Sequence, residues 1–359
     1  MSDITISLQQ QINAARKAGT ALHISGGNSK PRYGRPLSLE RLDMLPHKGV
    51  IDYRPEELVI TARAGTRLSE LNALMAEHGQ MLAGEPAIFG GQATIGGTVA
   101  SNLSGPGRPW YGSIRDSLLG LTLLTGDAQQ LRFGGRVIKN VAGYDVSRLQ
   151  CGALGCLGVI TEVSLKVIPR PVCSATLLQP INDAQDALQH MQDISQEFQS
   201  ITGNCWIDGL HYVRFEGLEK TVAAARASYS QRYGAAADVE DSDSLWASIG
   251  EHGHASFCQG LPLWRIHLHP TLPALIDGFT PIGIDWAGGL RWVTSDRTSL
   301  TQINSALSGV GQACLMNGAK DGEEVFPSID GPLKDIYLNL KSTFDPDSVL
   351  NPGRLYSWL

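Results

Sequence analysis

The sequence predicts an α+β protein made of two parts. Its 359 residues are enough for two domains with buried cores. The first part is rich in glycine, with 15 of the 40 glycines between residues 90 and 170. The second part alternates strand-like and helix-like segments, which is typical of an α+β domain. Pro169 and Pro171 end the last strand-like segment of the first part, and we place the boundary there.

Composition excludes several classes of protein. The net charge of −6 and the lack of Lys/Arg runs argue against a nucleic-acid surface. No apolar segment reaches the roughly 20 residues that span a bilayer. The N-terminal string MSDITISLQQ lacks the pattern of a secretory signal. We therefore predict a cytoplasmic protein, with any attachment to the inner membrane made through partner subunits.

The cysteines give no sign of a metal cluster. There are six, scattered and without a CxxC pair, so they indicate small buried side chains in a reducing compartment. We predict no metal site. His252 with His254, and His267 with His269, have i,i+2 spacing that could hold a metal, but paired surface histidines are commoner.

The first part begins with a helix, a strand and a small-residue loop. Leu8, Ile12 and Ala15 recur at helical spacing, and Gly19 follows where a helix C-cap glycine belongs. The apolar run 21–24 then breaks into the loop SGGNSK. Further strands are expected at 50–53, 58–64, 118–124, 130–133 and 159–168, with a helix from Leu68 to Gly79 and a hairpin turn at Gly126-Asp127.

The second part repeats strand and helix patterns of moderate length. Strands are expected at 175–178, 212–215, 264–268 and 289–293, and helices at 183–199, 218–231 and 297–308. The acidic, serine-rich stretch 236–248 is expected to be a solvated loop or the start of a poorly ordered helix.

The glycines of the first part point to a phosphate-bearing ligand. They sit beside hydroxyl and amide side chains in ATIGGTVASNLSG, WYGSIRD and GYDVSRLQCGALG, where backbone N–H groups can face an anion. Tight turns in an irregular β-rich domain are the simpler alternative for any one of these loops. A Rossmann site is excluded because Gly152, Gly155 and Gly158 are spaced by three and precede a strand rather than a helix. No GxxxxGK[ST] motif is present either.

These motifs resemble a known flavoprotein family. ATIGG, YGSIRD, GYD and LGVIT, in that order, resemble the FAD-binding domain of the vanillyl-alcohol oxidase and p-cresol methylhydroxylase (PCMH) family. The strings ELVITARAGT, GRPWYGSIRD, FGGRVIKNVAGYD and NPGRLY are similar to those of the smaller flavin-binding subunits of bacterial glycolate oxidases. The resemblance implies a PCMH-type domain of two subdomains (1–172). The alternating strands and helices of the second part indicate a ferredoxin-like α+β cap (173–340). We expect the C-terminal tail (341–359) to pack back on the FAD domain, because the apolar residues beside the turn Asn351-Pro352-Gly353 need a surface to bury against.

The resemblance also implies the residues that hold FAD. We expect FAD to be bound to the chain non-covalently, because the family's flavin-linking histidine has no counterpart in the loop SGGNSK. The alternative for Arg115 is a structural ion pair with Asp116. The implied cofactor-binding residues are Ser25, Gly26, Gly27, Asn28, Ser29, Lys30, Pro86, Thr94, Gly96, Gly97, Asn102, Ser113, Arg115, Gly158, Val159, Ile160 and Asn351.

The sequence indicates the substrate-binding residues less clearly than the cofactor-binding residues. Arg265 and Arg291 could each clamp a carboxylate or form a structural ion pair, and His267 and His269 are the candidate bases beside them. Catalytic relatives carry an HxGDGN-type histidine cluster that this chain lacks. Two hypotheses follow. In the first, the chain is a subunit of a glycolate-oxidising complex, with a second flavoprotein and an iron–sulfur protein as partners. In the second, it oxidises a 2-hydroxy acid by itself.

Overall fold

The computed structural model describes residues 2–135, 145–276 and 278–359, which form two compact units. Unit 1 consists of residues 1–103, 113–169 and 319–359, and unit 2 of residues 104–112 and 170–318. The chain therefore crosses between the units more often than the predicted linear division does. The division into 1–172, 173–340 and 341–359 stays a prediction. In the described part of the chain, no helix is both long and apolar enough to cross a membrane.

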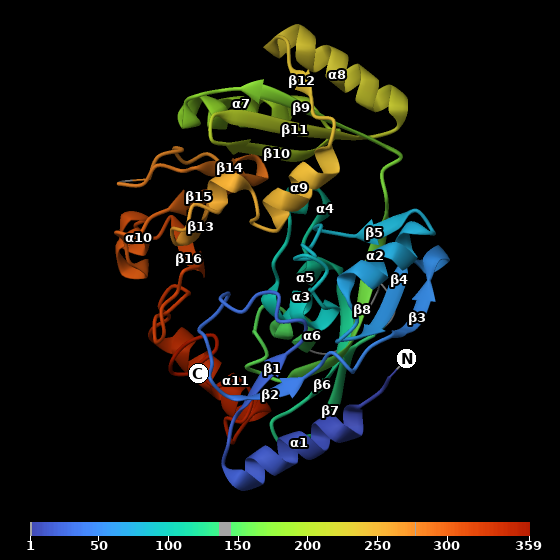
Figure 1. Cartoon of the computed structure of the whole chain (residues 1–359), viewed down its shortest axis with the longest axis vertical. Coiled ribbons are helices and arrows are strands. Elements are labelled where there is room, and N and C mark those ends of the chain that lie inside the picture. The colour runs from blue at the N-terminus through green and yellow to red at the C-terminus, as the bar shows by residue number, and fades with distance from the viewer. Residues whose placement is uncertain (1, 136–144, 277) are drawn as a thin grey trace. The chain divides into compact units, whose positions relative to one another are not determined.

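Unit 1 holds two sheets and the helices that cover them (Figure 1). The small parallel sheet pairs β1 (Leu22–Ser25) with β2 (Glu40–Asp43). The larger sheet runs β3-β4-β8-β6-β7, and β5 pairs with the far end of β8. Its strands are β3 (Val50–Arg54), β4 (Val59–Arg63), β5 (Gln80–Leu82), β6 (Leu118–Leu124), β7 (Gln130–Gly134) and β8 (Val159–Pro169). The helices are α1 (Thr5–Ala18), α2 (Leu68–Ala76), α3 (Ile95–Ser101), α5 (Ile114–Ser117), α6 (Val146–Gln150) and α11 (Pro332–Phe344).

Local sequence signals explain these elements. Leu8, Ile12 and Ala15 are buried on one face of α1, and Gly19 ends the helix in the left-handed conformation, as predicted. The predicted hairpin is formed by β6 and β7, which pair antiparallel from Gly120–Gly134 to Leu124–Gln130. The string FGGRVIKNVAGYD lies partly outside the described residues.

The C-terminal segment belongs to unit 1. The Leu22 backbone N–H donates to Val349 O (2.7 Å), and Asn351 N–H donates back to Leu22 O (3.0 Å). Val349 and Leu350 are buried in the main hydrophobic core of this unit. Figure 1 shows the red C-terminal helix α11 in the same region as the blue strands β1 and β2. The end of the chain thus completes the surroundings of β1, the strand that leads into the glycine loop.

Unit 2 is one antiparallel eight-stranded sheet in the order β12-β9-β11-β10-β14-β15-β13-β16. The first half has the order β-α-β-β-α-β along the chain, the element order of the predicted ferredoxin-like cap. In each half of unit 2 the first strand lies between the third and the fourth: β9 between β11 and β12, and β13 between β15 and β16. The second strands of the two halves, β10 and β14, pair with each other. The strands are β9 (Cys173–Pro180), β10 (Ile201–Ile207), β11 (Leu210–Gly217), β12 (Ala237–Asp238), β13 (Leu263–Leu268), β14 (Gly283–Asp285), β15 (Leu290–Thr294) and β16 (Gly311–Asn317).

Three helices of unit 2, at 184–197, 219–233 and 300–306, lie at predicted positions, whereas the short helix at 108–111 was not predicted. The stretch 236–248 was expected to be a solvated loop or the start of a poorly ordered helix. Residues 242–250 instead form a helix that Asp241 caps by accepting from Ser244 N–H. The strands β10, β12, β14 and β16 were not predicted. All seven residues of β10 are buried, so its polar and apolar residues show no surface alternation. The helices are α4 (Arg108–Tyr111), α7 (Ala184–Glu197), α8 (Glu219–Tyr233), α9 (Ser242–Gly250) and α10 (Leu300–Ala306).

Candidate cofactor pocket and a cationic cluster

The loop that follows β1 is shaped by two glycines. A Cβ on Gly27 would lie 1.7 Å from Gln92 O, and one on Gly26 would lie 2.5 Å from Thr94 Oγ1. Any larger residue would therefore clash with the chain segment that precedes α3. Asn28 follows with a positive φ of 51°, a conformation that asparagine adopts more readily than most residues. Close approach of two backbone segments explains why this loop needs glycine.

A pocket of about 560 Å³, part of it open to solvent, lies at this loop. It brings together nine of the predicted cofactor residues: Ser25, Gly26, Gly27, Asn28, Ser29, Lys30, Thr94, Gly97 and Asn351. Its other lining residues are His23, Ile24, Tyr33, Ala100, Ser101, Leu154 and Arg354. None of these sixteen side chains is acidic, so the donor set suits an anionic diphosphate.

Lys30 supplies a cation to this pocket. Its Nζ donates to Ser29 Oγ (3.1 Å) and lies 4.9 Å from the centre of the Phe89 ring. Burial lowers the pKa of Lys30 to about 8, since the ammonium loses solvation there. A bound diphosphate would favour the charged form again. These features fit a phosphate-bearing cofactor.

The start of α3 forms another part of the pocket wall. Thr94 caps this helix by accepting from Gly97 N–H (3.3 Å). A Cβ on Gly96 would lie 2.6 Å from Ala64 Cβ, so Gly96 lets the helix pack against the segment after β4. Asn102 ends α3 in the left-handed conformation, and its buried Oδ1 has no hydrogen-bond partner among the described residues.

Arg354 is a pocket residue that the sequence reasoning missed. Its guanidinium is buried and donates to four backbone carbonyls, those of Lys30 (3.2 Å), Pro31 (3.1 Å), Tyr33 (2.9 Å) and Arg35 (2.6 Å). It thereby holds the chain just beyond the glycine loop. Its place in the NPGRLY string was the available signal, but nothing in the string itself indicates which carbonyls it binds.

Asn351 acts beside Arg354 as a backbone clamp. Its Oδ1 accepts from Ile24 N–H (2.8 Å), and its Nδ2 donates to Leu154 O (2.6 Å). Both polar atoms of the side chain are thus used to join β1 to the turn before β8. Asn351 lines the pocket and also fixes the edge from which the glycine loop starts.

The remaining predicted cofactor residues lie elsewhere in unit 1. Ser113 caps α5, and the Asp116 carboxylate accepts from Ser113 N–H (2.9 Å) and Oγ–H (2.7 Å). Arg115 is exposed, and its backbone oxygen accepts from Arg148 Nε (3.2 Å). Pro86 is half-buried in the loop before α3. Gly158 precedes β8, where Val159 and Ile160 pair with Leu124 and Leu123 of β6.

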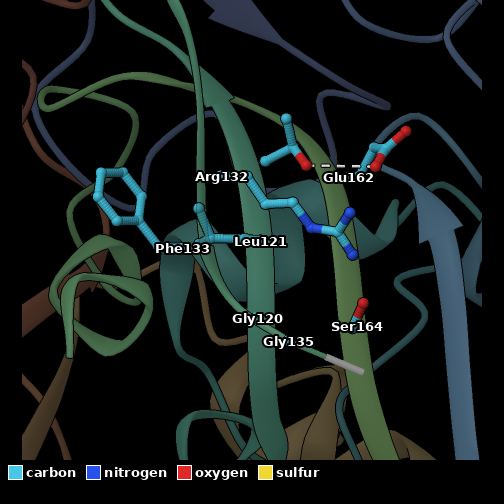
Figure 2. A pocket seen from close by; sticks show the side chains of 8 residues that line it. Gly120, Leu121, Arg132, Phe133, Gly135, Glu162 and Ser164 are labelled. Atoms are coloured by element: carbon cyan, nitrogen blue, oxygen red, sulfur yellow. Dashed lines mark hydrogen bonds between the residues drawn. The ribbon is translucent and has the colours of Figure 1, made fainter. Parts of the chain in front are cut away.

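A second, smaller hollow of about 180 Å³ lies on strands β6, β7 and β8. Figure 2 shows the Arg132 side chain extending between Glu162 and Ser164. Thr122 Oγ1 donates to the Glu162 carboxylate (3.2 Å). With a carboxylate in its wall and no predicted site residue, this hollow does not resemble the first pocket.

In unit 2, strand pairing separates the four catalytic candidates. Arg265 and His267 alternate along β13 and face the same side of the sheet. Arg291 pairs with Ile266, so it faces the other side. There it is fully buried, and its guanidinium donates to the carbonyls of Gly288 and Leu272. Burial lowers the pKa of Arg291 to about 10. The backbone contacts make Arg291 structural, though not through an ion pair.

His267 lies beside two guanidinium groups. Burial, Arg265 and Arg108 together lower its pKa to about 3, so the imidazole is neutral at physiological pH. His269 is exposed, and its Nδ1 is 2.8 Å from Thr271 Oγ1. Among the described residues, no group of three His, Cys, Asp or Glu side chains is placed to hold a metal ion.

Comparison with known proteins agrees with this geometry. The FAD binding domain family matches residues 6–134, which contain most of the pocket. The glycolate oxidase subunit GlcE of Escherichia coli strain K12 is 41% identical over 357 residues, which cover 99% of both chains. This chain belongs to the GlcE family. It is therefore a member of a family of FAD-dependent oxidoreductases with the PCMH-type fold, and the resemblance inferred from its motifs is confirmed.

More distant relatives of this GlcE-family chain include a glycolate oxidase subunit and a dehydrogenase. The glycolate oxidase subunit GlcD of Bacillus subtilis strain 168 is 28% identical over 176 residues, 49% of this chain and 36% of that subunit. A D-lactate dehydrogenase of Archaeoglobus fulgidus is 23% identical over 405 residues, covering 95% and 85%. Among solved structures, an alkyldihydroxyacetonephosphate synthase shares the fold, with a TM-score of 0.69 at 17% identity, covering 96% of this chain and 74% of the synthase.

Proposed function

We propose that this chain is the FAD-binding subunit of a multi-subunit glycolate dehydrogenase (glycolate oxidase) that oxidises glycolate to glyoxylate. The observation that carries the proposal is the acid-free pocket at the glycine loop, in a chain that aligns along its whole length with a glycolate oxidase subunit. FAD would supply the hydride-accepting ring. In this proposal electrons leave to an iron–sulfur partner, and a second flavoprotein subunit completes the complex.

The chain's own residues hold and screen the cofactor in this proposal. The backbone N–H groups of the loop from Ser25 to Ser29 face the diphosphate, and Lys30 neutralises part of its charge. Arg354 and Asn351 keep this loop in place through backbone carbonyls and N–H groups. We propose that the cofactor is held non-covalently, because the loop contains no histidine. The wider set of contacts is Pro86, Thr94, Gly96, Gly97, Asn102, Ser113, Arg115, Gly158, Val159 and Ile160.

The complex is proposed to work in the cytoplasm, at the inner membrane where its partners require it. The relatives named GlcE and GlcD are both subunits of glycolate oxidases, which supports a multi-subunit assembly. The ferredoxin-like identity of unit 2 is part of the same proposal, supported by its element order. We infer that this unit contributes to the environment of the substrate or of the partner subunits.

One observation favours a second function, in which the chain oxidises a 2-hydroxy acid by itself. Arg265 and the neutral His267 share one side of β13, so a carboxylate and a hydroxyl could be bound by neighbouring groups. Against this function, the low pKa of His267 makes it a weak general base near neutral pH.

The test is the cofactor content of the purified full-length chain. We expect one FAD per chain, released by acid or heat and absent from the polypeptide band on a denaturing gel. Flavin that stays on the polypeptide would disprove non-covalent binding. A colourless chain that takes up no added FAD would disprove the proposed function.

A further inference from the structure

A buried ion pair lies behind the pocket wall in unit 1. Lys341, near the end of α11, is 4% exposed, and Asp345, which follows the helix, is fully buried. Lys341 Nζ and Asp345 Oδ2 are 2.6 Å apart. Two charges are costly to remove from water, so a buried pair needs further hydrogen bonds to its remaining donors and acceptors. Neither residue is among those that line the pocket.

The protein satisfies every donor of the Lys341 ammonium. Besides the carboxylate of Asp345, the ammonium donates to Cys156 O (2.9 Å) and to Leu350 O (2.8 Å). An ammonium has three N–H donors, and these three acceptors use all of them. The two carbonyls belong to segments that are far apart in the chain, one before β8 and one after α11. Lys341 therefore joins these two segments behind the pocket.

Asp345 fixes the direction in which the chain continues beyond α11. Its carboxylate accepts from Val349 N–H (2.9 Å) and from Leu350 N–H (2.8 Å). A Cβ on Gly126, in the turn between β6 and β7, would clash with the same carboxylate, so Asp345 has no room to move toward that turn. The C-terminal segment is thereby held directly before the pocket residue Asn351.

The two segments that Lys341 joins are also connected by Asn351. Its Nδ2 donates to Leu154 O (2.6 Å), two residues before Cys156, and Cys156 Sγ donates to Asn351 O (3.4 Å). Cys156 thus contacts Asn351, and Leu350 is the residue before it. The ammonium of Lys341 binds the carbonyls of both neighbours of Asn351.

We propose that the buried pair of Lys341 and Asp345 positions Asn351 for cofactor binding. The pair acts through Asn351, whose Oδ1 accepts from Ile24 N–H (2.8 Å) in the strand that leads into the glycine loop. Lys341 and Asp345 are positioning residues, because they hold a pocket residue without lining the pocket themselves. The inference rests on the proposed function, since it takes FAD to be the ligand of this pocket.

The proposal separates cofactor affinity from stability. Removing only one charge leaves the other buried without its partner, and this destabilises the chain whatever the pair does for the cofactor. A variant without either charge avoids that penalty. If the pair serves folding alone, the folded variant keeps its natural FAD affinity. If the pair positions Asn351, FAD affinity falls although the variant is folded.

The test uses the full-length chain, freed of flavin and titrated with FAD at a temperature where circular dichroism shows each variant to be folded. Lys341→Met combined with Asp345→Asn should weaken FAD binding by about tenfold, the effect of losing one buried hydrogen bond. Asn351→Gly removes the clamp side chain, and glycine readily adopts the positive φ of 46° at this position. In the Asn351→Gly background the same two substitutions should change FAD affinity by less than about threefold, because the pair acts through Asn351.

The surface ion pair of Arg16 and Asp347 is the matched control. Arg16 Nε lies 2.7 Å from Asp347 Oδ2, so this pair also ties the segment after α11 to another element, but both side chains are partly exposed. Arg16→Met combined with Asp347→Asn should bind FAD as the natural chain does, since exposed ion pairs contribute little.

Each outcome decides the matter. Natural FAD affinity in the folded Lys341→Met/Asp345→Asn variant overturns the inference, and so do losses that add to that of Asn351→Gly. If this variant does not fold, Asp345→Asn alone decides, because it keeps the side-chain shape: several-fold weaker binding supports the inference, and unchanged affinity overturns it. A natural chain that takes up no FAD contradicts the proposed function and this inference with it. A natural chain that binds FAD, beside unaffected variants, contradicts only this inference.

Discussion

Arg354 in unit 1 and Arg265 in unit 2 are equally buried arginines in opposite surroundings. Arg354 is 7% exposed and donates to four backbone carbonyls, whereas Arg265 is 6% exposed and its Nε has no partner among the described residues. The first arginine has its bonding satisfied by the protein and shapes a pocket from behind. The second has a buried Nε–H group that no described residue accepts. Burial alone therefore does not say how completely the protein satisfies the hydrogen bonds of an arginine, and the acceptors around the guanidinium decide that.

The largest expected effect is at Arg354. Arg354→Met should remove the donor of four backbone carbonyls, each hydrogen bond to the charged group being worth about 1.5–3 kcal/mol. We expect the free energy of unfolding to fall by at least about 3 kcal/mol and the FAD to be lost. Denaturant unfolding and flavin absorbance measure the two effects. Arg265→Met is the comparison, and a similar loss of stability in both variants would remove the distinction between the arginines.

The next largest effect is expected at the glycines of the FAD pocket, where substitutions of Gly27 and Gly97 should have different consequences. Gly27→Ala places a Cβ 1.7 Å from Gln92 O, so the loop must move, and we expect an unstable chain without FAD. Gly97→Ala places its Cβ 3.2 Å from Thr94 Oγ1, a contact that a small shift relieves. Gly97 lines the pocket, so this variant should stay folded while binding FAD more weakly; Gly97→Val should lose FAD altogether.

Thermal denaturation with and without added FAD measures how strongly the Gly97 variants bind the cofactor. Saturating a site 100-fold above its Kd adds about 2.7 kcal/mol of stability, so loss of that increment is visible as a lower melting temperature. Full flavin content in Gly97→Val would show that Gly97 is only a helix residue.

A smaller effect is expected at Lys30, as a pH dependence of cofactor affinity. The pKa of Lys30 is lowered from its ordinary value of 10.5 to about 8 in the free pocket, and a bound diphosphate would raise it again. FAD binding should then take up a proton above pH 8. Affinity should fall by up to about tenfold per pH unit as pH rises from 8, until the pKa of the complex is reached. The neighbouring charged or titratable groups are His23, Tyr33 and Arg354.

Lys30→Met should remove this slope and weaken binding at pH 7, with the exposed Lys320→Met as its control. In the absence of FAD, the contribution of Lys30 to folding stability has the opposite pH dependence and becomes more favourable as pH rises. A lysine pKa lowered in the folded chain penalises folding fully below pH 8, and the penalty disappears as pH rises toward 10.5. Equal pH profiles of FAD affinity in Lys30→Met and the natural chain would show that Lys30 does not face the diphosphate.

The smallest expected effect is the response of the isolated chain to glycolate. His267 has a pKa of about 3, too low for efficient removal of a hydroxyl proton near neutral pH. We expect no rapid bleaching of the flavin when glycolate is added anaerobically to the lone subunit, and bleaching when the partner subunits are present. Stopped-flow absorbance makes the measurement. Rapid bleaching by the lone chain that disappears in His267→Gln would instead assign the oxidation to this subunit.

The sequence by itself determined much of unit 1, because the signals there are local. Gly19 ends α1, the hairpin of β6 and β7 forms at its predicted turn, and the loop from Ser25 to Lys30 follows a strand as expected. Glycine loops beside hydroxyl side chains carry their chemistry in a few consecutive residues. The same strings were enough to identify the FAD-binding family, which the full-length similarity to GlcE confirms.

Only the tertiary structure decided which distant residues meet. Strand β10 is buried at every position, so no periodicity marks it in the sequence. Arg354 donates to carbonyls more than 300 positions earlier in the chain. Arg108 contacts the Trp286 ring, although no local sequence pattern links these two residues either. Arg265 and Arg291 look alike as sequence, yet strand register places them on opposite sides of one sheet. Register and burial depend on long-range packing, and for that reason these arginines acquire different roles only in the folded chain.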